Sequence, residues 1–221
     1  MTDFAAAYRG VRERVSALVA PIGDDVDHRP VPATPEWTAR DVLAHLVGVA
    51  ADVLAGNLQG AGTDPWTARQ VEERRDRSVT EMLAEWEVSA ATVEAVMNDF
   101  GPPAGQLVFD AVTHEYDLCG AFGIGADRSS DALAIGFDWL CGSRASGTGG
   151  ALRLVTEAGS HEYGPGDPVA TVEAERFELF RGATGRRSRA QMVAWRWDPE
   201  PHPELVVLAS LFTMRATDLV E

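Results

Sequence analysis

Hydrophobic residues recur at steps of three and four positions through the first two thirds of the chain, between short breaks rich in Pro, Gly and Asp. At 3.6 residues per turn, this spacing brings the apolar positions onto one face of a helix. The strict alternation of a half-buried strand is nearly absent there. The pattern predicts helices at 3–19, 38–56, 78–98, 104–122 and 130–140, with a loop at 24–35 and a polar loop that holds Pro65 and Trp66.

Capping signals mark the start of two of these helices. Thr38 is followed three residues later by Asp41, and Ser78 by Glu81, the spacing at which each side chain can bond the other's free backbone N–H. Trp37, just before the first cap, is expected to act as a hydrophobic staple. Four helices of similar length with mostly short connections indicate a helical bundle.

The pattern changes at GSRASGTGG, residues 142–150, which has the composition of a linker. From Ala151, ALRLVTE alternates like a strand, HEYGPGDP is a candidate hairpin, and 169–172 is short and β-branched. Helices are expected at 173–181 and 188–193. The expected fold class is therefore mainly α with α+β: a four-helix bundle over residues 1–146, then a small C-terminal α+β domain over 147–221.

Composition and charge exclude several classes of function. The chain has 221 residues, with 34 acidic and 19 basic residues for a formal net charge of −15, so it should repel nucleic acid. All 19 basic residues are Arg, which excludes Schiff-base chemistry and a lysine-bearing phosphate loop. We find no signal peptide and no apolar stretch long enough for a membrane span, and only Cys119 and Cys141 are present. These features predict a cytoplasmic protein.

The residues best suited to chemistry gather in FDAVTHEYDL, residues 109–118. Asp110 and His114 are four residues apart, so they lie about 40° apart on one helix face, to which Asp117 returns. A carboxylate and an imidazole one turn apart can chelate a divalent metal. His45 is a third candidate, because it stands mid-helix among apolar residues, where a buried imidazole needs a partner. Three ligands from two helices, with a fourth position left for another molecule, would form a catalytic type of metal site.

Simpler interpretations of these residues stay open. Asp110 and His114 could form an ordinary i, i+4 surface pair. His45 could be a core or boundary histidine bonded to Asp41, one turn earlier, or to Asp52, two turns later. Of these two partners, Asp41 already has an explanation in the helix cap.

The remaining polar residues give weaker signals. No G-x-S-x-G or Cys–His signature of a protein nucleophile is present, and both cysteines are expected to be buried and inert. His28, His161 and His202 lie in turn-like contexts and are expected to be solvated. RGATGRRSRAQ, residues 181–191, concentrates arginines that could bind a carboxylate in bidentate fashion, or could form a solvated loop paired with local acids.

Several stretches resemble one known family. PEWTARDVLAHLVG at 35–48 resembles the second-helix signature of the DinB-like superfamily, in its mycothiol-dependent maleylpyruvate isomerase branch. FDAVTHEYDL resembles the second metal motif of that branch. The stretches at 67–87 and 177–201 resemble further segments of the same actinobacterial family, so the resemblance covers most of the chain.

The resemblance implies a DinB-like bundle with a divalent metal, usually zinc, with nickel, iron and manganese as other candidates. The family's ligands are a His of the second helix and an acidic residue and a His four apart on a later helix. By position these are His45, Asp110 and His114. The usual acidic residue is Glu, so Asp110 brings a shorter reach. Asp117 matches a later acid of the motif and is placed to hydrogen-bond a ligand from behind.

The resemblance also implies a chemistry. The metal would bind mycothiol and stabilise its thiolate, which in the isomerase adds to an activated alkene and permits cis/trans rotation. An arginine of the C-terminal domain helps to hold the substrate, and Arg186 and Arg187 are the candidates.

The expected function is therefore that of a metal- and mycothiol-dependent isomerase or thiol transferase acting on a small electrophile, as a monomer or a homodimer. The alternatives are a metal-dependent hydrolase that activates water at the same site, and a non-catalytic protein that binds a metal or a ligand.

Overall fold

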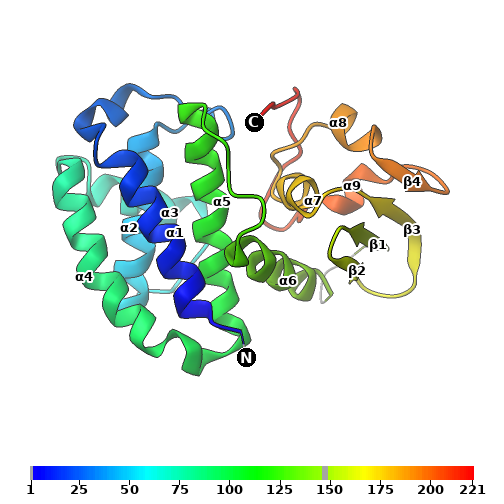
Figure 1. The fold of residues 1–221 in the computed structure, drawn as a ribbon, viewed down its shortest axis with the longest axis horizontal. Helices are drawn as coiled ribbons and strands as arrows, with labels where there is room; N and C mark the ends of the chain where they lie inside the picture. The colour runs from blue at the N-terminus through cyan, green and yellow to red at the C-terminus, as the bar shows by residue number, and fades with distance from the viewer. Residues whose placement is uncertain (1, 146–148) are drawn as a thin grey trace. The chain divides into compact units, whose positions relative to one another are not determined.

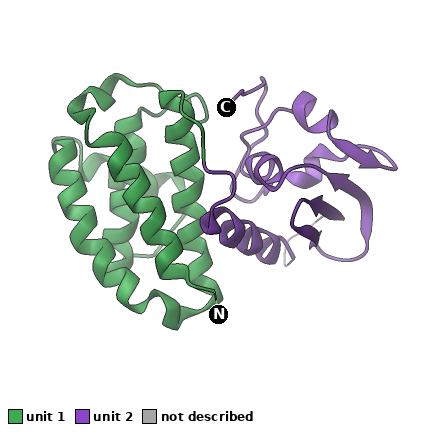
Figure 2. Ribbon diagram, in the orientation of Figure 1, with its two compact units in different colours: residues 1–126, 221 green, residues 127–220 purple. Residues whose placement is uncertain are grey.

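The computed structural model describes residues 2–145 and 149–221. The chain divides into two compact units, residues 1–126 together with 221, and residues 127–220, coloured separately in Figure 2. The boundary predicted between residues 146 and 147 lies outside the described residues. The observed division comes earlier, because helix α6 (Asp131–Ala145) packs on β2 (Gly159–Tyr163) and α7 (Arg176–Ala183) of the second unit.

Unit 1 is a helical bundle. Its elements are α1 (Phe4–Val19), the 3-10 helix η1 (Gly23–His28), α2 (Ala39–Ala55), α3 (Asp64–Glu73), α4 (Val79–Met97), the 3-10 helices η2 (Asn98–Phe100) and η3 (Pro102–Ala104), and α5 (Gly105–Phe122). Helices α1 and α2 each pack on both α4 and α5, which lie on either side of them in Figure 1. The four predicted bundle helices are confirmed, and η1 occupies part of the predicted loop at 24–35.

The predicted helix caps form as expected. Both capping boxes are present, with Thr38 and Asp41 at the start of α2 and Ser78 and Glu81 at the start of α4. Gly56 ends α2 in the left-handed conformation, with φ of 70°, which a residue without a side chain adopts at low cost. The start and the end of α2 are thus both set by local sequence, and the helix carries His45 in its middle turns.

The prediction of a polar loop around Pro65 and Trp66 was wrong, because these residues lie in helix α3. Pro65 stands within the first turn, where its missing N–H has no helical partner to lose. Only Trp66 and Gln70 of this helix are buried, so it has no continuous apolar stripe that a search for periodicity could detect. The missed helix turns out to border the candidate site.

Unit 2 combines a small sheet with short helices. Its elements are α6, β1 (Ala151–Thr156), β2, β3 (Pro168–Glu173), α7, α8 (Arg189–Val193), β4 (Arg196–Asp198) and α9 (Pro203–Val206). The strand order is β2-β1-β3-β4, in which β1 is antiparallel to β2 and parallel to β3. The predicted C-terminal α+β domain is therefore confirmed in fold class.

The hairpin of unit 2 lies earlier than predicted. Its turn falls between β1 and β2, since Thr156 pairs with Gly159, whereas the sequence pattern had placed it at 161–168. The glycine- and proline-rich residues there connect β2 to β3, which pairs with β1 instead. Helix α7 also begins later than expected, at Arg176, because the preceding residues to Glu173 extend β3.

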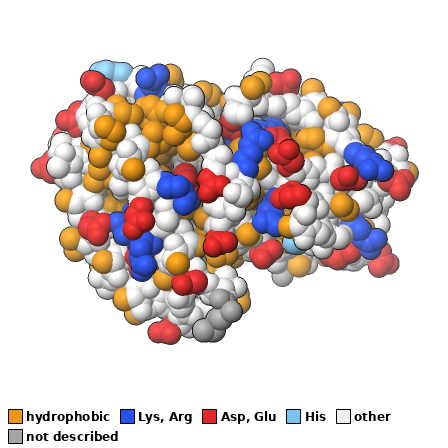
Figure 3. All heavy atoms as spheres, in the orientation of Figure 1, with side chains coloured by type: hydrophobic (Ala, Val, Ile, Leu, Met, Phe, Trp, Pro, Cys, Tyr) orange, Lys and Arg blue, Asp and Glu red, His pale blue; other side chains and the backbone are white. Residues whose placement is uncertain are grey.

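Arginines and acidic residues are mixed over the surface. Among the described residues, no helix is long and apolar enough to cross a membrane. On the face that Figure 3 shows, acidic and Arg side chains are interspersed on both units. The pairs Arg153–Glu162 and Arg196–Glu173 are examples of such contacts in unit 2. Much of the positive charge is therefore offset locally.

Candidate metal centre

His45 lies inside the bundle because nearly every residue of the central turns of α2 is buried. The side chain is 5% exposed and its Nε2 atom lies 3.4 Å from Oδ1 of Asp110. The local sequence explains this placement, since the apolar residues on both sides of His45 draw the whole segment into the core. A polar ring at this depth requires partners on both nitrogens.

Helix α5 supplies the other candidate ligands. His114 Nε2 lies 3.9 Å from the same Asp110 Oδ1, and the two rings of His45 and His114 meet edge to face with centroids 4.9 Å apart. One nitrogen from each histidine and one carboxylate oxygen all lie within 4.8 Å of one another. The structure therefore brings together the three residues that were predicted to hold a metal.

Each histidine uses its other ring nitrogen to bond a fixed acceptor. Nδ1 of His45 lies 2.8 Å from Oε1 of Gln70, and Nδ1 of His114 lies 3.0 Å from Oδ2 of the fully buried Asp117. Because amide and carboxylate oxygens accept hydrogen bonds, the proton of each neutral ring sits on Nδ1. Both Nε2 lone pairs then face the Asp110 carboxylate, so three acceptors converge on one place.

Such a convergence requires a cation, either a proton or a metal ion. Burial lowers the pKa of His45, but the charge of Asp110 and hydrogen bonds from the His45 ring to Asp110 and Gln70 outweigh burial and raise that pKa. Burial also lowers the pKa of His114, and the hydrogen bond to Asp117 offsets this only in part. Two imidazole nitrogens and one carboxylate oxygen at these separations fit a divalent transition metal, since zinc bonds of about 2.0–2.2 Å would span them.

Two tryptophans form aromatic walls around the histidines. The ring of Trp37 stacks on His114, with centroids 5.8 Å apart and planes 18° apart, and lies 5.5 Å from the ring of His45. Trp66, from α3, meets His45 edge-on at 6.3 Å, and its Nε1 donates to the backbone oxygen of Asn57. Trp37 was expected to staple the start of α2, and the structure places its ring against the candidate ligands as well.

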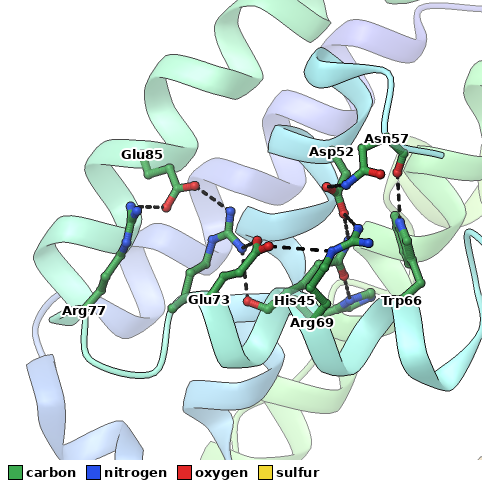
Figure 4. A network of polar contacts seen from close by, with 10 residues as sticks. His45, Asp52, Asn57, Trp66, Arg69, Glu73, Arg77 and Glu85 are labelled. Carbon is green, nitrogen blue, oxygen red and sulfur yellow. Dashed lines mark hydrogen bonds and ion pairs between the residues drawn. The ribbon is translucent and has the colours of Figure 1, made fainter. Parts of the chain in front are cut away.

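Gln70 is the residue that the sequence did not reveal. The alternative partners considered for His45 were Asp41 and Asp52, but neither contacts its ring. Asp41 caps α2, and Asp52 reaches His45 only through Gln70, whose Nε2 donates to Asp52 Oδ2 at 2.7 Å. Figure 4 shows this network, which runs from His45 to Asp52, Asn57 and Arg69. No spacing rule connects Gln70 to His45, because the two lie on different helices.

The two candidate arginines of the C-terminal unit, Arg186 and Arg187, are buried. Arg186 and Arg187 are 5% and 2% exposed, so these two are not solvated, although Arg187 does pair with a local acid as the alternative expected. Arg187 holds Glu178 in a bidentate pair at 2.6 and 2.9 Å, and Arg186 Nη1 donates to the backbone oxygen of Thr184 at 2.6 Å. The turn before them is fixed by Gly185, which has a φ of 76°.

The Arg187–Glu178 pair predicts a pH-dependent stability. Burial would raise the pKa of Glu178, but the hydrogen bond and charge of Arg187 outweigh burial and lower that pKa below 4.5. The ion pair therefore adds to the free energy of unfolding at pH values above the ordinary pKa of 4.5. This contribution is lost as the pH falls through the lower pKa that Glu178 has in the folded protein. We expect Glu178→Gln to lower the free energy of unfolding by about 1–3 kcal/mol at neutral pH and by less in acid, measured by urea titration.

The control for this prediction is Glu162→Gln, which removes an exposed ion pair with Arg153. Surface pairs of this kind contribute about 0–1 kcal/mol, so this variant should unfold much as wild type does at both pH values. Equal losses for Glu178→Gln at neutral and acid pH would contradict the assigned ionic contribution.

Among the described residues, the cluster of candidate ligands includes none of the other histidines and neither cysteine. His161 was expected to be solvated, but it packs edge-on against Phe137 at 5.1 Å, and His202 lies 3.2 Å from Glu204. Cys119 and Cys141 are buried, as predicted, and burial raises the pKa of the Cys141 thiol to about 12. A thiol with this pKa is not a thiolate at neutral pH, which agrees with the absence of a nucleophile signature in the sequence.

Comparison with known proteins agrees with this architecture. Two solved structures, described as the crystal structure of the mycothiol-dependent maleylpyruvate isomerase and that of a mutant of this isomerase, share 16% and 15% identity with the chain. Their TM-scores are 0.60 and 0.59, and each match covers 90% of this chain and 95% of the other, which establishes a common fold. No curated protein matches the chain. Residues 8–119, half of the chain, match the family model described as the mycothiol maleylpyruvate isomerase N-terminal domain, and the chain belongs to that family.

Proposed function

We propose that the protein is a metal- and mycothiol-dependent enzyme, an isomerase or thiol transferase that acts on a small electrophilic substrate. The observation that carries the proposal is the convergence of His45 Nε2, His114 Nε2 and the Asp110 carboxylate within 4.8 Å, with both Nδ1 atoms bonded to acceptors. Membership of the family supports the use of mycothiol. Similarity to the solved isomerase supports an isomerase-like arrangement of the chain.

In this proposal, some residues of the centre hold the metal and others orient the metal ligands. His45, Asp110 and His114 would hold a divalent metal, most simply zinc, while Gln70 and Asp117 fix the two imidazole rings. A metal so held would act as a Lewis acid and favour the thiolate form of a bound thiol at neutral pH.

Asp110 replaces the glutamate that is usual in the family, and its shorter side chain reaches the two histidines at 3.4 and 3.9 Å. For substrate recognition the candidates are Arg186 and Arg187, and the guanidinium of Arg187 also pairs with Glu178. The proposed ligand for either arginine is the carboxylate of a small acid.

The proposal is tested by following the loss of maleylpyruvate in the presence of the purified protein, with metal and thiol varied independently. We expect turnover only with both a divalent metal and mycothiol, and none after treatment with a chelator. Turnover without any thiol would indicate a metal-dependent hydrolase. A protein that binds metal but consumes neither maleylpyruvate nor other activated alkenes would be a binding protein.

A further inference from the structure

Gln70 is a fully buried amide with both of its polar atoms bonded. It lies on α3 with 0% exposure, its Oε1 is 2.8 Å from Nδ1 of His45, and its Nε2 is 2.7 Å from Oδ2 of Asp52. A buried amide without such partners is costly, so this side chain is stable only in this arrangement. Gln70 therefore joins a candidate metal ligand to a buried carboxylate.

Asp52 determines which way the amide of Gln70 points. The Asp52 carboxylate accepts hydrogen bonds from Asn57 Nδ2 at 2.9 Å, from Arg69 Nη2 at 3.1 Å and from Gln70 Nε2. An ionised carboxylate can only accept, so the NH2 group of Gln70 must face Asp52 and its carbonyl must face His45. His45 must then carry its proton on Nδ1, which leaves the Nε2 lone pair directed toward the other candidate ligands.

The neutral amide has a further effect on His45. An amide oxygen accepts a hydrogen bond without taking the proton, so the Nδ1 proton stays on the His45 ring and its place is defined. His114 is held by a carboxylate, Asp117, so the two histidines are fixed by chemically different partners.

Helix α3 is anchored so that Gln70 cannot easily withdraw. Arg74, one turn later, donates from Nη1 to the backbone oxygen of Gln70 at 3.0 Å and pairs through Nη2 with Glu85 of α4 at 2.6 Å. Gly48 of α2 faces Gln70, and a Cβ atom there would lie only 2.5 Å from the Gln70 Cβ. The close approach of α3 to α2 therefore depends on a glycine one turn beyond His45.

We propose that Gln70 is a positioning residue for the metal centre, whose amide, oriented by Asp52, holds the His45 ring with Nε2 directed at the metal. This inference rests on the proposed metal centre. Figure 4 shows contacts that run without a break from His45 to Asp52 and Arg69. From Arg69 they continue to Glu73, and through Arg74 to Glu85 and Arg77. Gln70 would act on the metal only through the His45 ring.

The test compares metal affinity among variants by competition with a chromogenic chelator, using Zn²⁺ as the probe. Gln70→Met keeps the length of the side chain but leaves Nδ1 of His45 without its acceptor, and we expect about 10- to 100-fold weaker binding. Glu85→Gln is the matched control, because it loosens the anchoring of α3 without touching the contacts of His45. This control should bind Zn²⁺ within about threefold of wild type.

A double variant separates positioning from simple loss of packing. Gln70→Glu alone sets two carboxylates against each other and should weaken binding, whereas Gln70→Glu with Asp52→Asn restores a donor facing an acceptor and again offers His45 an oxygen. The double variant should recover most of the affinity. The visible spectrum of the Co²⁺-loaded proteins, which reports coordination geometry, should change in Gln70→Met and return in the double variant.

The outcomes are distinct. Unchanged Zn²⁺ affinity in folded Gln70→Met, or equal losses in Gln70→Met and Glu85→Gln, would overturn the positioning role while leaving the metal centre in place. If Gln70→Met does not fold, the double variant decides the question. A double variant that binds Zn²⁺ no more tightly than Gln70→Glu would also overturn the positioning role. A wild-type protein that binds no divalent metal would instead refute the proposed function.

Discussion

His114→Ala and His45→Ala are each expected to abolish metal binding and, with it, thiol-dependent turnover. Each substitution removes one of three converging ligands, and the remaining pair should bind a divalent ion on the order of 1,000-fold more weakly. The measurement is the zinc content of protein purified without a chelator or an affinity tag. His161→Ala is the matched control, because this histidine packs on Phe137 in the other unit. Zinc that persisted in both ligand variants would place the metal elsewhere in the chain.

Gly48→Ala is expected to damage both the fold and the metal centre. Alanine normally stabilises a helix by up to about 1 kcal/mol relative to glycine. Here the added Cβ would lie 2.5 and 2.7 Å from two side-chain carbons of Gln70 and 3.0 Å from Arg74 Nη1, so α3 must move. We expect a loss of about 1–3 kcal/mol in the free energy of unfolding and about 10- to 100-fold weaker Zn²⁺ binding.

The control for this substitution is Gly142→Ala, in the last turns of α6, where an added Cβ meets no atom within 4 Å. That variant should show unchanged metal binding and equal or slightly greater stability in urea. If Gly48→Ala behaved in the same way, the close contact between α2 and α3 would not matter to the site.

The bundle could be predicted from the sequence because the signals that define its helices come from residues close together in the chain. The four-residue spacing of Asp110 and His114 fixes their common face on α5, and the caps at Thr38 and Ser78 fix where α2 and α4 begin. His45 was identifiable because a polar residue surrounded by apolar ones must be buried with a partner. These arguments need only helical geometry and the cost of burying polar groups.

The parts that could not be predicted depend on contacts between distant segments. Helix α3 was missed because its stability comes from Trp66 and Gln70 at its buried face and from ion pairs, so no apolar period marks it. Gln70 reaches His45 across 25 residues of sequence, and nothing in its neighbours signals that contact. The burial of Arg187 follows in the same way from its nine-residue separation from Glu178, across the turn at Gly185.

The two hydrogen-bond acceptors that hold the histidine rings differ in how far the sequence could reveal them. Asp117 was expected behind a ligand because it matches a later acid of the family's motif, and it does bond His114 Nδ1 at 3.0 Å. The equivalent support for His45 comes from another helix and from a neutral side chain. The family resemblance therefore identified the residue that supports His114, and the structure identified the residue that supports His45.

The most direct test of the central claim is a titration of Co²⁺-loaded protein with mycothiol, followed by absorption spectroscopy. A protein that binds the thiol at a metal held by His45, Asp110 and His114 should develop a thiolate-to-cobalt charge-transfer band that saturates at one thiol per chain. The band should be absent from His114→Ala carried through the same reconstitution. A Co²⁺ spectrum that mycothiol leaves unchanged, in protein that has taken up the metal, would contradict the account.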